Sequence, residues 1–408
     1  MKKVMIVGAG AGQVPLIQHC KNLGLFTIVI SPFGPYPGIA MADKHIDEDI
    51  FNRDSLVEIG KVEGIDYVIS DQSDYAVPIV AYVADKLGLP GNSTEVAETY
   101  TYKSKFRRFC QENGIPAPKA VVIDISDSDY SLISDLRFPV VIKPADSQGS
   151  RGISKVMEPS GIEDALENAS RYTRGNQVVV EEYFQGREIV CEGFVINGVY
   201  YNVAFGDREY FNLDGLFIPS KTKFPAYLSD SAKEKLIANE KKIASKLNTS
   251  FGIVHSEYLI NENDEFVVIE SALRGGGVYI ASHLIPLSTG IDLTKVLVSA
   301  MKGKYDECIE MLHPSDKGAA EYLCFYLKEG NVSSVKGREA FAENPDVVIA
   351  EIDNISEGDR IARFEHKGMR KGPFIIKGKD MKAVSSTEAF IKSILSIEVD
   401  EKPGIVWQ

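Results

Sequence analysis

The sequence predicts a mixed α/β protein of several domains, and three observations lead to that fold class. The first hundred residues alternate apolar runs with amphipathic stretches, which is the pattern of a parallel, doubly wound sheet. Short β-rich runs dominate from about residue 118 to 201 and return after 315, which indicates a small α+β subdomain and a β-rich final unit. The 408 residues also exceed what one hydrophobic core usually supports.

The N-terminal alternation can be followed element by element. Three apolar runs are expected to be strands. They alternate with stretches that place apolar side chains on one face of a helix. The turn Gly88–Gly91 closes this first domain, which we expect to span residues 1–100. The expected strands are Val4–Val7, Phe26–Ile30 and Tyr67–Ile69, and the expected helices are Leu16–Leu23, Leu56–Val62 and Val77–Leu87.

The next unit begins with a helix over Tyr102–Gly114, because Pro116 and Pro118 forbid its continuation. Short strands should then alternate with turns as far as about Tyr201. The expected strands are Ala120–Ile123, Val140–Ile142, Val178–Val180 and Ile189–Ile196.

A second long helix is predicted from Ser231, which together with Glu234 resembles a capping box. Beyond that helix, Gly252–Ile260 and Glu265–Ser271 predict a β-hairpin around the polar tetrapeptide Asn261–Asp264. We therefore expect a second domain over 101–314, with a small α+β subdomain at about 118–187, and a third domain over 315–408.

Composition excludes several classes of partner. The net charge of −13 is spread along the chain, so a basic nucleic-acid-binding face is not expected. No uninterrupted apolar run reaches the ~18 residues of a membrane helix. The five cysteines lie far apart without a C-x-x-C pair, which argues against disulfide frameworks and zinc sites. We expect a protein of the cytoplasm that binds neither nucleic acid nor membranes.

The glycine-rich loop Gly8–Gly12 follows the first strand and invites a dinucleotide-binding interpretation. The third glycine of that fingerprint is replaced by Gln13, and the acidic residue expected after the second strand is replaced by Ser31 and Pro32. An incomplete fingerprint is weak evidence. A tight turn or a small-substrate contact is the favoured alternative.

Two lysines suit the phosphates of a nucleotide. Lys143 ends the apolar run Val140–Ile142, where a charge is costly unless it has an anionic partner. Gly149 and Gly152 follow it in a loop whose backbone could close over phosphates. Lys103 would face the same cleft. The alternatives are a structural ion pair for Lys143 and a solvated helix position for Lys103.

The run from Val178 to Phe184 has the form of an adenine edge, because strand backbone groups offer a purine one donor and one acceptor. Glu188 follows the turn Gly186–Arg187 and could accept the ribose hydroxyls. Each glutamate in this stretch taken singly is equally compatible with a solvated surface position, so only their order along the chain is informative.

Glu257 and Glu270 are the candidate metal ligands. They lie on opposite arms of the predicted hairpin, where cross-strand neighbours can present two carboxylates to one point. Oxygen ligands together with nucleotide phosphates suit Mg²⁺. Arg274 precedes Gly275–Gly277 and could grip a carboxylate or an acyl phosphate with its planar guanidinium. A solvated strand face is the alternative for the glutamates.

These residues, in this order, resemble the ATP-grasp superfamily of carboxylate-amine ligases, which includes biotin carboxylase, carbamoyl phosphate synthetase, L-amino acid ligases and several purine-biosynthesis enzymes. The resemblance covers nearly the whole chain. It implies a Rossmann-like N-terminal domain, a central ATP-grasp fold with a small lid subdomain, and a C-terminal β-rich domain. Lys103 then matches the family's lysine before Gly114, and Asp146–Gly152 matches its lid loop.

The same resemblance implies a set of site residues for ATP and Mg²⁺. Catalytic roles fall to Arg274, Lys143 and Lys103, and the metal ligands are Glu257 and Glu270. One departure is Ala272, where most members carry a metal-binding asparagine, although carboxyaminoimidazole ribonucleotide synthases look similar there. The implied nucleotide contacts are Lys103, Lys143, Ser147, Gly149, Ser150, Gly152, Glu181, Glu182, Tyr183, Phe184, Glu188 and Leu259.

The function this implies is the ATP-dependent joining of a small-molecule carboxylate to an amine through an acyl phosphate, with release of ADP and phosphate. The resemblance also implies a homodimer. A purine-biosynthesis enzyme of the same fold, such as phosphoribosylglycinamide synthetase or a carboxyaminoimidazole ribonucleotide synthase, is one alternative. A non-catalytic ATP-binding protein, suggested by Ala272, and a nicotinamide-dependent dehydrogenase, suggested by Gly8–Gly12, are the others.

Overall fold

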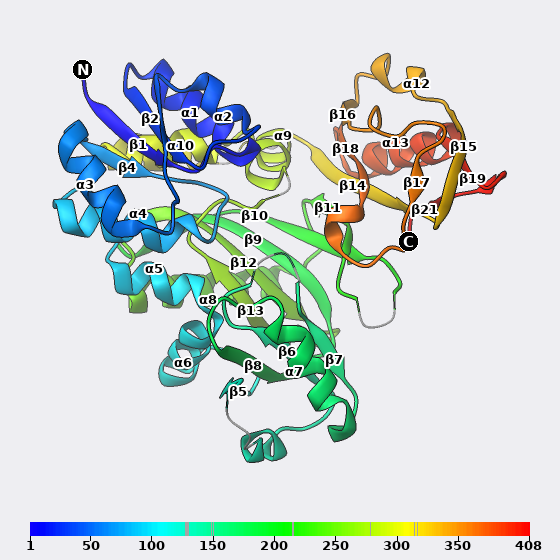
Figure 1. Ribbon diagram of the computed structural model, residues 1–408, viewed down its shortest axis with the longest axis horizontal. Coiled ribbons are helices and arrows are strands. Elements are labelled where there is room, and N and C mark those ends of the chain that lie inside the picture. The colour runs from blue at the N-terminus through cyan, green and yellow to red at the C-terminus, as the bar shows by residue number, and fades with distance from the viewer. Residues whose placement is uncertain are drawn as a thin grey trace.

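A computed structural model describes residues 1–126, 130–147, 149, 151–213, 216–277, 279–313, 315 and 317–408. The chain forms a parallel α/β unit, a small lid sheet, a long antiparallel sheet and a C-terminal part, which Figure 1 shows in blue, green, yellow-green and orange to red. The α/β fold class predicted from the sequence is confirmed.

The N-terminal unit is a four-stranded parallel sheet in the order β3-β2-β1-β4. Alternate residues of β1 face two different cores: Val4 and Ile6 pack with α1 and α10 (Leu293–Met301), whereas Met5 and Val7 pack with α3 and α4. Helices therefore cover both faces, as the alternation predicted. The elements are β1 (Lys3–Val7), α1 (Val14–Asn22), β2 (Phe26–Ser31), α2 (Pro37–Met41), β3 (Lys44–Asp47), α3 (Arg53–Glu63), β4 (Tyr67–Ile69) and α4 (Ala76–Leu87).

Two helices connect this unit to the lid. The sequence prediction had only the second of them, α6 (Lys103–Asn113), and missed α5 (Thr94–Thr101), whose Ser93 accepts a hydrogen bond from the Val96 amide as its N-cap. The lid itself is an antiparallel sheet in the order β5-β8-β6-β7 with α7 on one side. Its elements are β5 (Ala120–Asp124), β6 (Val140–Pro144), β7 (Ser154–Val156), α7 (Ile162–Ser170) and β8 (Gln177–Glu182).

A long antiparallel sheet forms the centre of the molecule. Its strand β9, buried except for its first residue, alternates between two cores, with Val190 and Phe194 facing α10 and Ile189 and Val195 facing α8. The hairpin expected around 261–264 is present as β12 and β13. The elements are β9 (Arg187–Ile196), β10 (Val199–Tyr210), β11 (Pro219–Phe224), α8 (Asp230–Leu247), β12 (Phe251–Ile260), β13 (Phe266–Ala272), a π-helical turn (Ile280–Leu284), α9 (Ile285–Thr289), α10 (Leu293–Met301) and α11 (Tyr305–Met311).

The predicted start of the second long helix was wrong by two residues. Helix α8 begins at Asp230, and the Ser229 hydroxyl accepts the amide of Ala232. Ser231 lies inside the first turn, where no capping box can form. The S-x-x-E pattern therefore indicated the right helix and the wrong cap, because Ser229 is an equally good N-cap residue.

The C-terminal part continues the same central sheet. Strand β14 pairs with β11 and with β18, so the sheet runs β13-β12-β9-β10-β11-β14-β18-β16 across the boundary expected near residue 314. The division into three domains stays a prediction. The elements are β14 (Ala319–Leu327), β15 (Gly330–Lys336), α12 (Glu339–Ala342), β16 (Val347–Ala350), β17 (Arg360–Ile361), β18 (Lys371–Gly378), α13 (Met381–Ile394), β19 (Ser396–Val399), β20 (Lys402–Pro403) and β21 (Ile405–Val406).

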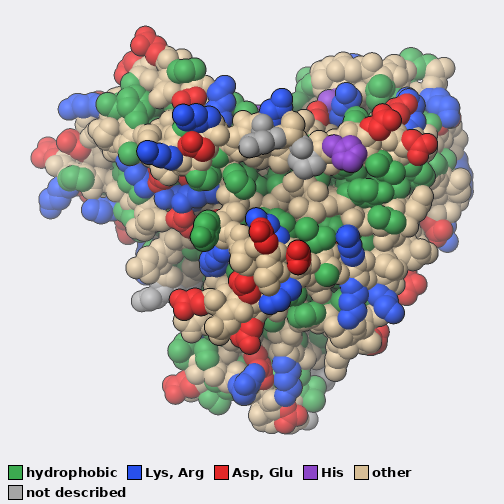
Figure 2. Space-filling view, turned by 180° about the vertical axis from the view of Figure 1, so that it is seen from behind, with side chains coloured by type: hydrophobic (Ala, Val, Ile, Leu, Met, Phe, Trp, Pro, Cys, Tyr) green, Lys and Arg blue, Asp and Glu red, His purple; other side chains and the backbone are tan. Residues whose placement is uncertain are grey.

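The sequence led us to expect neither a basic nucleic-acid-binding face nor a membrane-spanning helix. On the face shown in Figure 2, acidic and basic side chains are interspersed and do not gather into one basic surface. In the part of the chain that the structure describes, no single helix has the length and hydropathy of a membrane span. One pair, Ile280–Thr289 with Leu293–Met301, reaches them only when both are counted together across a bend of 110°.

Candidate functional site

A cavity of about 610 Å³ opens between the lid sheet and the hairpin β12–β13. It brings together twelve of the predicted residues from opposite sides of the fold: Lys103, Lys143, Ser147, Gly149, Glu181, Glu182, Tyr183, Phe184, Glu188, Glu257, Leu259 and Glu270. Two predicted residues do not line it, namely Gly152, which packs near Pro144 and Tyr172, and Arg274. Ser150 lies outside the described residues.

The lysines occupy one side of this cavity. Lys143 does have a carboxylate partner, since its Nζ lies 2.8 Å from Glu181, whose other oxygen accepts a hydrogen bond from Arg107 at 2.6 Å. Burial would raise the pKa of Glu181, but the two cations more than offset it and hold that pKa low. The structural ion pair considered for Lys143 is therefore real, and it coexists with a position on the cavity wall.

Lys103 sits at the N-terminus of α6 and reaches into the same space. Its Nζ donates to the backbone oxygen of Ser147 at 3.0 Å and lies 3.7 Å from Glu270. Only 12 % of its side chain is exposed, so the solvated alternative for Lys103 is wrong.

The far end of the cavity can accept a flat apolar ring. Val141 and Ile153 of the lid and Leu259 and Ile269 of the hairpin line it. Beside them the chain leaves β8, and the Tyr183 amide donates to Pro139 while the Phe184 amide has no partner within the described residues. A free backbone donor next to apolar walls is what a purine edge needs.

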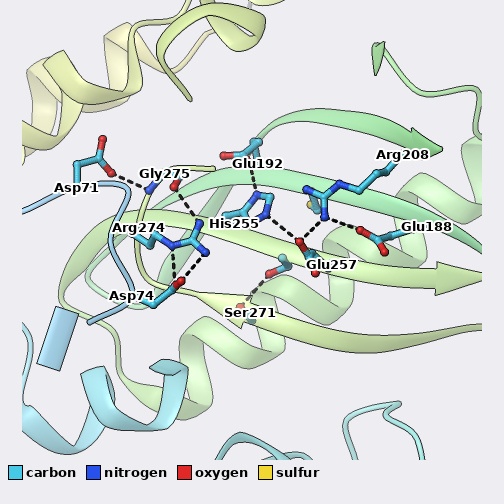
Figure 3. Close-up of polar contacts among 12 residues, drawn as sticks. Asp71, Asp74, Glu188, Glu192, Arg208, His255, Glu257, Ser271, Arg274 and Gly275 are labelled. Carbon is cyan, nitrogen blue, oxygen red and sulfur yellow. Dashed lines mark hydrogen bonds and ion pairs between the residues drawn. The ribbon is translucent and has the colours of Figure 1, made fainter. Parts of the chain in front are cut away.

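A buried network of charges lies along β9, β10 and β12 (Figure 3). Arg208 donates to both Glu188 and Glu257. Burial raises the pKa of Glu188 to about 7, with Arg208 opposing and Glu257 adding to the shift. Burial acts in the same direction on Glu257, but Arg208 and His255 outweigh it and hold the pKa of Glu257 well below its ordinary value.

His255 is a second cation beside Glu257, and the sequence analysis missed it. Its Nδ1 bonds the fully buried Glu192, and its Nε2 lies 3.4 Å from Glu257. Burial would lower the pKa of His255, but Glu192 more than offsets it and the pKa is raised to about 9. The alternation H-x-E on one strand face was the available signal, because residues i and i+2 share a face.

The two candidate metal ligands meet as predicted. Glu257 and Glu270 are register partners across β12–β13 and both line the cavity. No group of three or more His, Cys, Asp or Glu side chains able to hold a metal ion is found among the described residues. The two facing carboxylates are oxygen donors of the kind Mg²⁺ takes, but they are paired with Arg208, His255 and Lys103, so a cation would have to displace at least one of these groups.

Arg274, which does not line the cavity, is held by the N-terminal unit. Its Nε and Nη2 donate to the two oxygens of Asp74 at 2.6 and 2.9 Å, and the neighbouring Gly275 amide donates to Asp71 at 2.8 Å (Figure 3). Burial alone would raise the pKa of Asp74, but Arg274 outweighs it and the pKa is lowered. We call these four residues the interdomain clamp.

Neither aspartate of the clamp was predicted. Asp71 and Asp74 follow β4 at the carboxyl end of a parallel strand, which is where open α/β sheets place their binding residues. That position was the signal in the sequence, whereas the partner Arg274 lies 200 residues away.

The glycine loop after β1 is filled by the protein itself. The Oε1 of Gln13 accepts a hydrogen bond from the Gly10 amide at 2.9 Å, and its Nε2 donates one to the backbone oxygen of Asp71 at 2.6 Å. A β-carbon at Gly38 would lie 2.8 Å from the Ala9 oxygen, so α2 packs directly on the loop. This agrees with the tight-turn interpretation and leaves the dinucleotide hypothesis without support.

Lys367, from the C-terminal part, is another residue that the sequence analysis missed. A β-carbon built at Gly149 of the lid loop would lie 3.0 Å from its Nζ, so the two segments touch. No carboxylate lies within ion-pair distance of Lys367 among the described residues. Burial and the neighbouring Arg370 lower the pKa of Lys367 to about 8, with Glu257 opposing.

The sequence is similar to one protein family and to several known ligases. Residues 109–276 match the family described as D-ala D-ala ligase C-terminus. Alanine–anticapsin ligase of Bacillus subtilis is 23% identical over 63% of this chain and 59% of its own length, and the carbamoyl phosphate synthase large chain of Agathobacter rectalis is 24% identical over 83% of this chain and 32% of its own length. The chain thus spans less than two thirds of the length of these relatives.

Solved structures extend the similarity to the whole fold. An L-amino acid ligase from Bacillus licheniformis superposes with a TM-score of 0.80 at 20% identity, covering 98% of this chain and 99% of that one. A phosphoribosylglycinamide synthetase from Anaerococcus prevotii gives 0.76 at 21% identity, covering 98% of this chain and 100% of that one. Together with the lid, the hairpin and the cavity between them, these matches show that the chain has the ATP-grasp fold of these ligases.

Proposed function

We propose that this protein is an ATP-dependent carboxylate-amine ligase. The observation that carries the proposal is one cavity with a purine-sized apolar end at Leu259 and a facing carboxylate pair, Glu257 and Glu270, with Lys103 and Lys143 also on its wall. In MgATP, the base requires apolar walls, the phosphates require cations, and the metal requires carboxylate oxygens.

The chain's own residues would bind and orient the nucleotide. The free amide of Phe184 would donate to the purine edge, and Glu188 would accept the ribose hydroxyls once Arg208 turns toward the phosphates. Lys103 and Lys143 would donate to phosphate oxygens, Lys143 while keeping its bond to Glu181. These groups stabilise charge that spreads over the transferred phosphoryl group, and catalysis of phosphoryl transfer rests mainly on such positioning.

Glu257 and Glu270 would hold Mg²⁺, which when bound supplies charge neutralisation for the phosphates. Arg208, His255 and Lys103 now neutralise the same carboxylates, so binding requires at least Arg208 to release Glu257. Ala272 supplies no ligand, and its register partner is His255.

The reaction needs no protein nucleophile. A substrate carboxylate oxygen attacks the terminal phosphorus of ATP, forming an O–P bond while the bond to ADP breaks. The amine nitrogen then attacks the acyl carbon, a C–N bond forms, and phosphate leaves with the electron pair of the C–O bond. Arg274, two residues beyond β13, would have to leave Asp74 or the Gly275 backbone oxygen before it could orient the acyl phosphate.

A second candidate function is that of a purine-biosynthesis ligase of the same fold. It is supported by the similarity to the phosphoribosylglycinamide synthetase and to N5-carboxyaminoimidazole ribonucleotide synthetase from Thermotoga maritima, which superposes with a TM-score of 0.70 at 18% identity. The sequence Glu270-Ser-Ala272-Leu-Arg274 also favours it, because carboxyaminoimidazole ribonucleotide synthases resemble this chain there.

The test is phosphate release from MgATP in the presence of pools of amino acids and of purine-pathway carboxylates and amines. A ligase releases phosphate only with a productive pool, and the identity of that pool separates the two candidates. Glu270→Gln should abolish release, whereas Glu262→Gln, an exposed glutamate in the turn of the same hairpin, should not. Nucleotide binding without release in any pool would instead support a non-catalytic protein.

We also propose a homodimer in the cytoplasm. The homodimer rests on the resemblance, and the cytoplasm rests on the five cysteines, all buried and unpaired. Sedimentation velocity measures the first and cell fractionation the second.

A further inference from the structure

A second cavity of about 270 Å³ adjoins the first and belongs mainly to the N-terminal unit. It shares Lys103, Ser147 and Glu270 with the nucleotide cavity, so the two spaces meet beside the candidate metal ligand. Its volume lies just below the ~300–1,000 Å³ typical of sites for drug-sized ligands, which suits a small metabolite. A small molecule bound in it would lie beside the part of the nucleotide cavity that Glu270 lines.

The carboxylates that line this cavity differ in whether other groups of the protein already bind them. Asp74 is bound to Arg274, and Asp146 accepts hydrogen bonds from the Thr173 hydroxyl and from the amides of Arg174 and Gly175. Glu270, 3.7 Å from Lys103, is the acid left facing the shared space.

Two arginines on the wall of this cavity lack a carboxylate. Arg53 at the start of α3 stacks on Tyr82, with its guanidinium carbon 4.2 Å from the ring centroid. Arg174 of the lid stacks on Phe51 at 3.7 Å and on Tyr75 at 5.0 Å. Neither has an ion-pair partner among the described residues. Stacking fixes the guanidinium planes and leaves their N–H edges for a planar anion.

We propose that this second cavity binds the amine substrate of the ligase, and that this substrate is an amino acid. Its nitrogen points toward Glu270 and the shared space, and its carboxylate lies against Arg53 and Arg174. The inference rests on the proposed function, because only a ligase has an amine substrate. The walls contributed by Tyr75, Pro78 and Ile79 favour an amino acid whose side chain has an apolar body.

The orientation matches the chemistry. The nitrogen attacks the acyl carbon, the C–N bond forms, and the C–O bond to phosphate breaks with its electrons on the leaving phosphate. Of the two protons that an ammonium group loses on becoming an amide, one ends on the phosphate and one in solvent. The product is an amide whose free carboxylate is still held by the arginines.

The experiment measures phosphate release with three forms of each productive acceptor: the amino acid, its amide, and the amine that lacks the carboxylate. The amino acid should have a KM roughly tenfold or more below those of the other two, since each charge-assisted hydrogen bond is stronger than a neutral one. Arg53→Gln and Arg174→Gln should raise the KM of the amino acid by a similar factor, leave the KM of the amide unchanged and leave the KM of ATP unchanged.

Matched controls remove charge from the same elements without touching the cavity. Lys61→Gln lies on α3 and Arg171→Gln just beyond α7 on the lid, and both residues form exposed surface ion pairs. Both controls should behave as the native protein. Arg174→Lys should recover part of the discrimination between the amino acid and its amide, because it keeps the charge.

Three outcomes are distinguishable. If no acceptor and carboxylate pair produces phosphate, the proposed function itself fails. If release occurs but the amino acid and its amide are used equally, the ligase stands and the amino-acid site is overturned. If Arg174→Gln raises the KM of ATP and of both acceptor forms alike, Arg174 only closes the lid on Phe51 and the inference is likewise overturned.

Discussion

Removal of one carboxylate from the interdomain clamp should loosen the junction between the N-terminal unit and the hairpin. In Asp74→Asn the Arg274 guanidinium keeps its charge and loses its ionic partner. The two side chains are 15 % and 13 % exposed, so the charge left behind is mostly buried. Leaving a buried charge unpaired costs about 3–5 kcal/mol, and the residual exposure favours the lower end of that range. About 3 kcal/mol corresponds to a roughly hundredfold change in the opening equilibrium.

Hydrogen exchange of peptides covering 70–77 and 271–277 reads this opening directly, without requiring the whole chain to unfold in two states. We expect both peptides to lose about a hundredfold in protection together. The double variant Asp74→Asn/Arg274→Gln should recover most of it, because no unpaired charge remains. Asp54→Asn, which removes an exposed aspartate of α3, is the control. Unchanged protection in Asp74→Asn would refute the reasoning.

Two further predictions concern buried charges elsewhere. Burial raises the pKa of Glu321, whose two oxygens have no hydrogen-bond partner in the described part of the chain, from 4.5 to about 8. The folded protein therefore holds a proton that the unfolded chain releases between about pH 4.5 and 8, so stability should fall across that window, by about 5 kcal/mol at most. Glu321→Gln should show a smaller fall in thermal midpoint from pH 5 to 8 than the native protein, and identical pH profiles would contradict this. The control is Glu310→Gln, which changes an exposed glutamate of α11. Lys367→Met should weaken binding of a non-hydrolysable ATP analogue roughly tenfold in calorimetry and leave thermal stability unchanged or higher, since it removes a cation without a carboxylate partner. Equal binding by the native protein and the variant would argue against a phosphate contact. Lys377→Met on β18 is the control.

The parts of the site that could be predicted from the sequence are those defined by local pattern. Glu257 and Glu270 lie on the two arms of one hairpin, so their proximity could be expected from sequence. Their direct pairing could not be counted, because a bulge between Glu257 and Tyr258 shifts the register by one residue. Lys143 ends a buried strand, where an uncompensated charge is costly, and both the cavity and an anionic partner were expected. A strand or hairpin reveals such relations because each residue's face is set by its position.

The parts that could not be predicted depend on contacts between distant segments. Nothing near Arg274 indicates Asp74, and nothing near Gly149 indicates Lys367, because these pairs are made by the packing of separate units. Glu188 was expected to face a ribose, yet Arg208 from the next strand reaches it first. A side chain's chemistry can be inferred from sequence, but the partner that satisfies it is chosen by tertiary structure.

The pairing of β11 with β14 has a consequence for how the chain is made. Strand β10 lines the nucleotide cavity through Arg208–Tyr210, and its neighbour β11 pairs with β14, where Lys221 is the register partner of Leu323 about a hundred residues later. Until β14 leaves the ribosome, β11 is an open sheet edge next to an unfinished ligand site. A shortened chain ending before residue 315 would carry that edge permanently. Such a fragment should self-associate, and the ATP site should be sought only in a chain that includes β14.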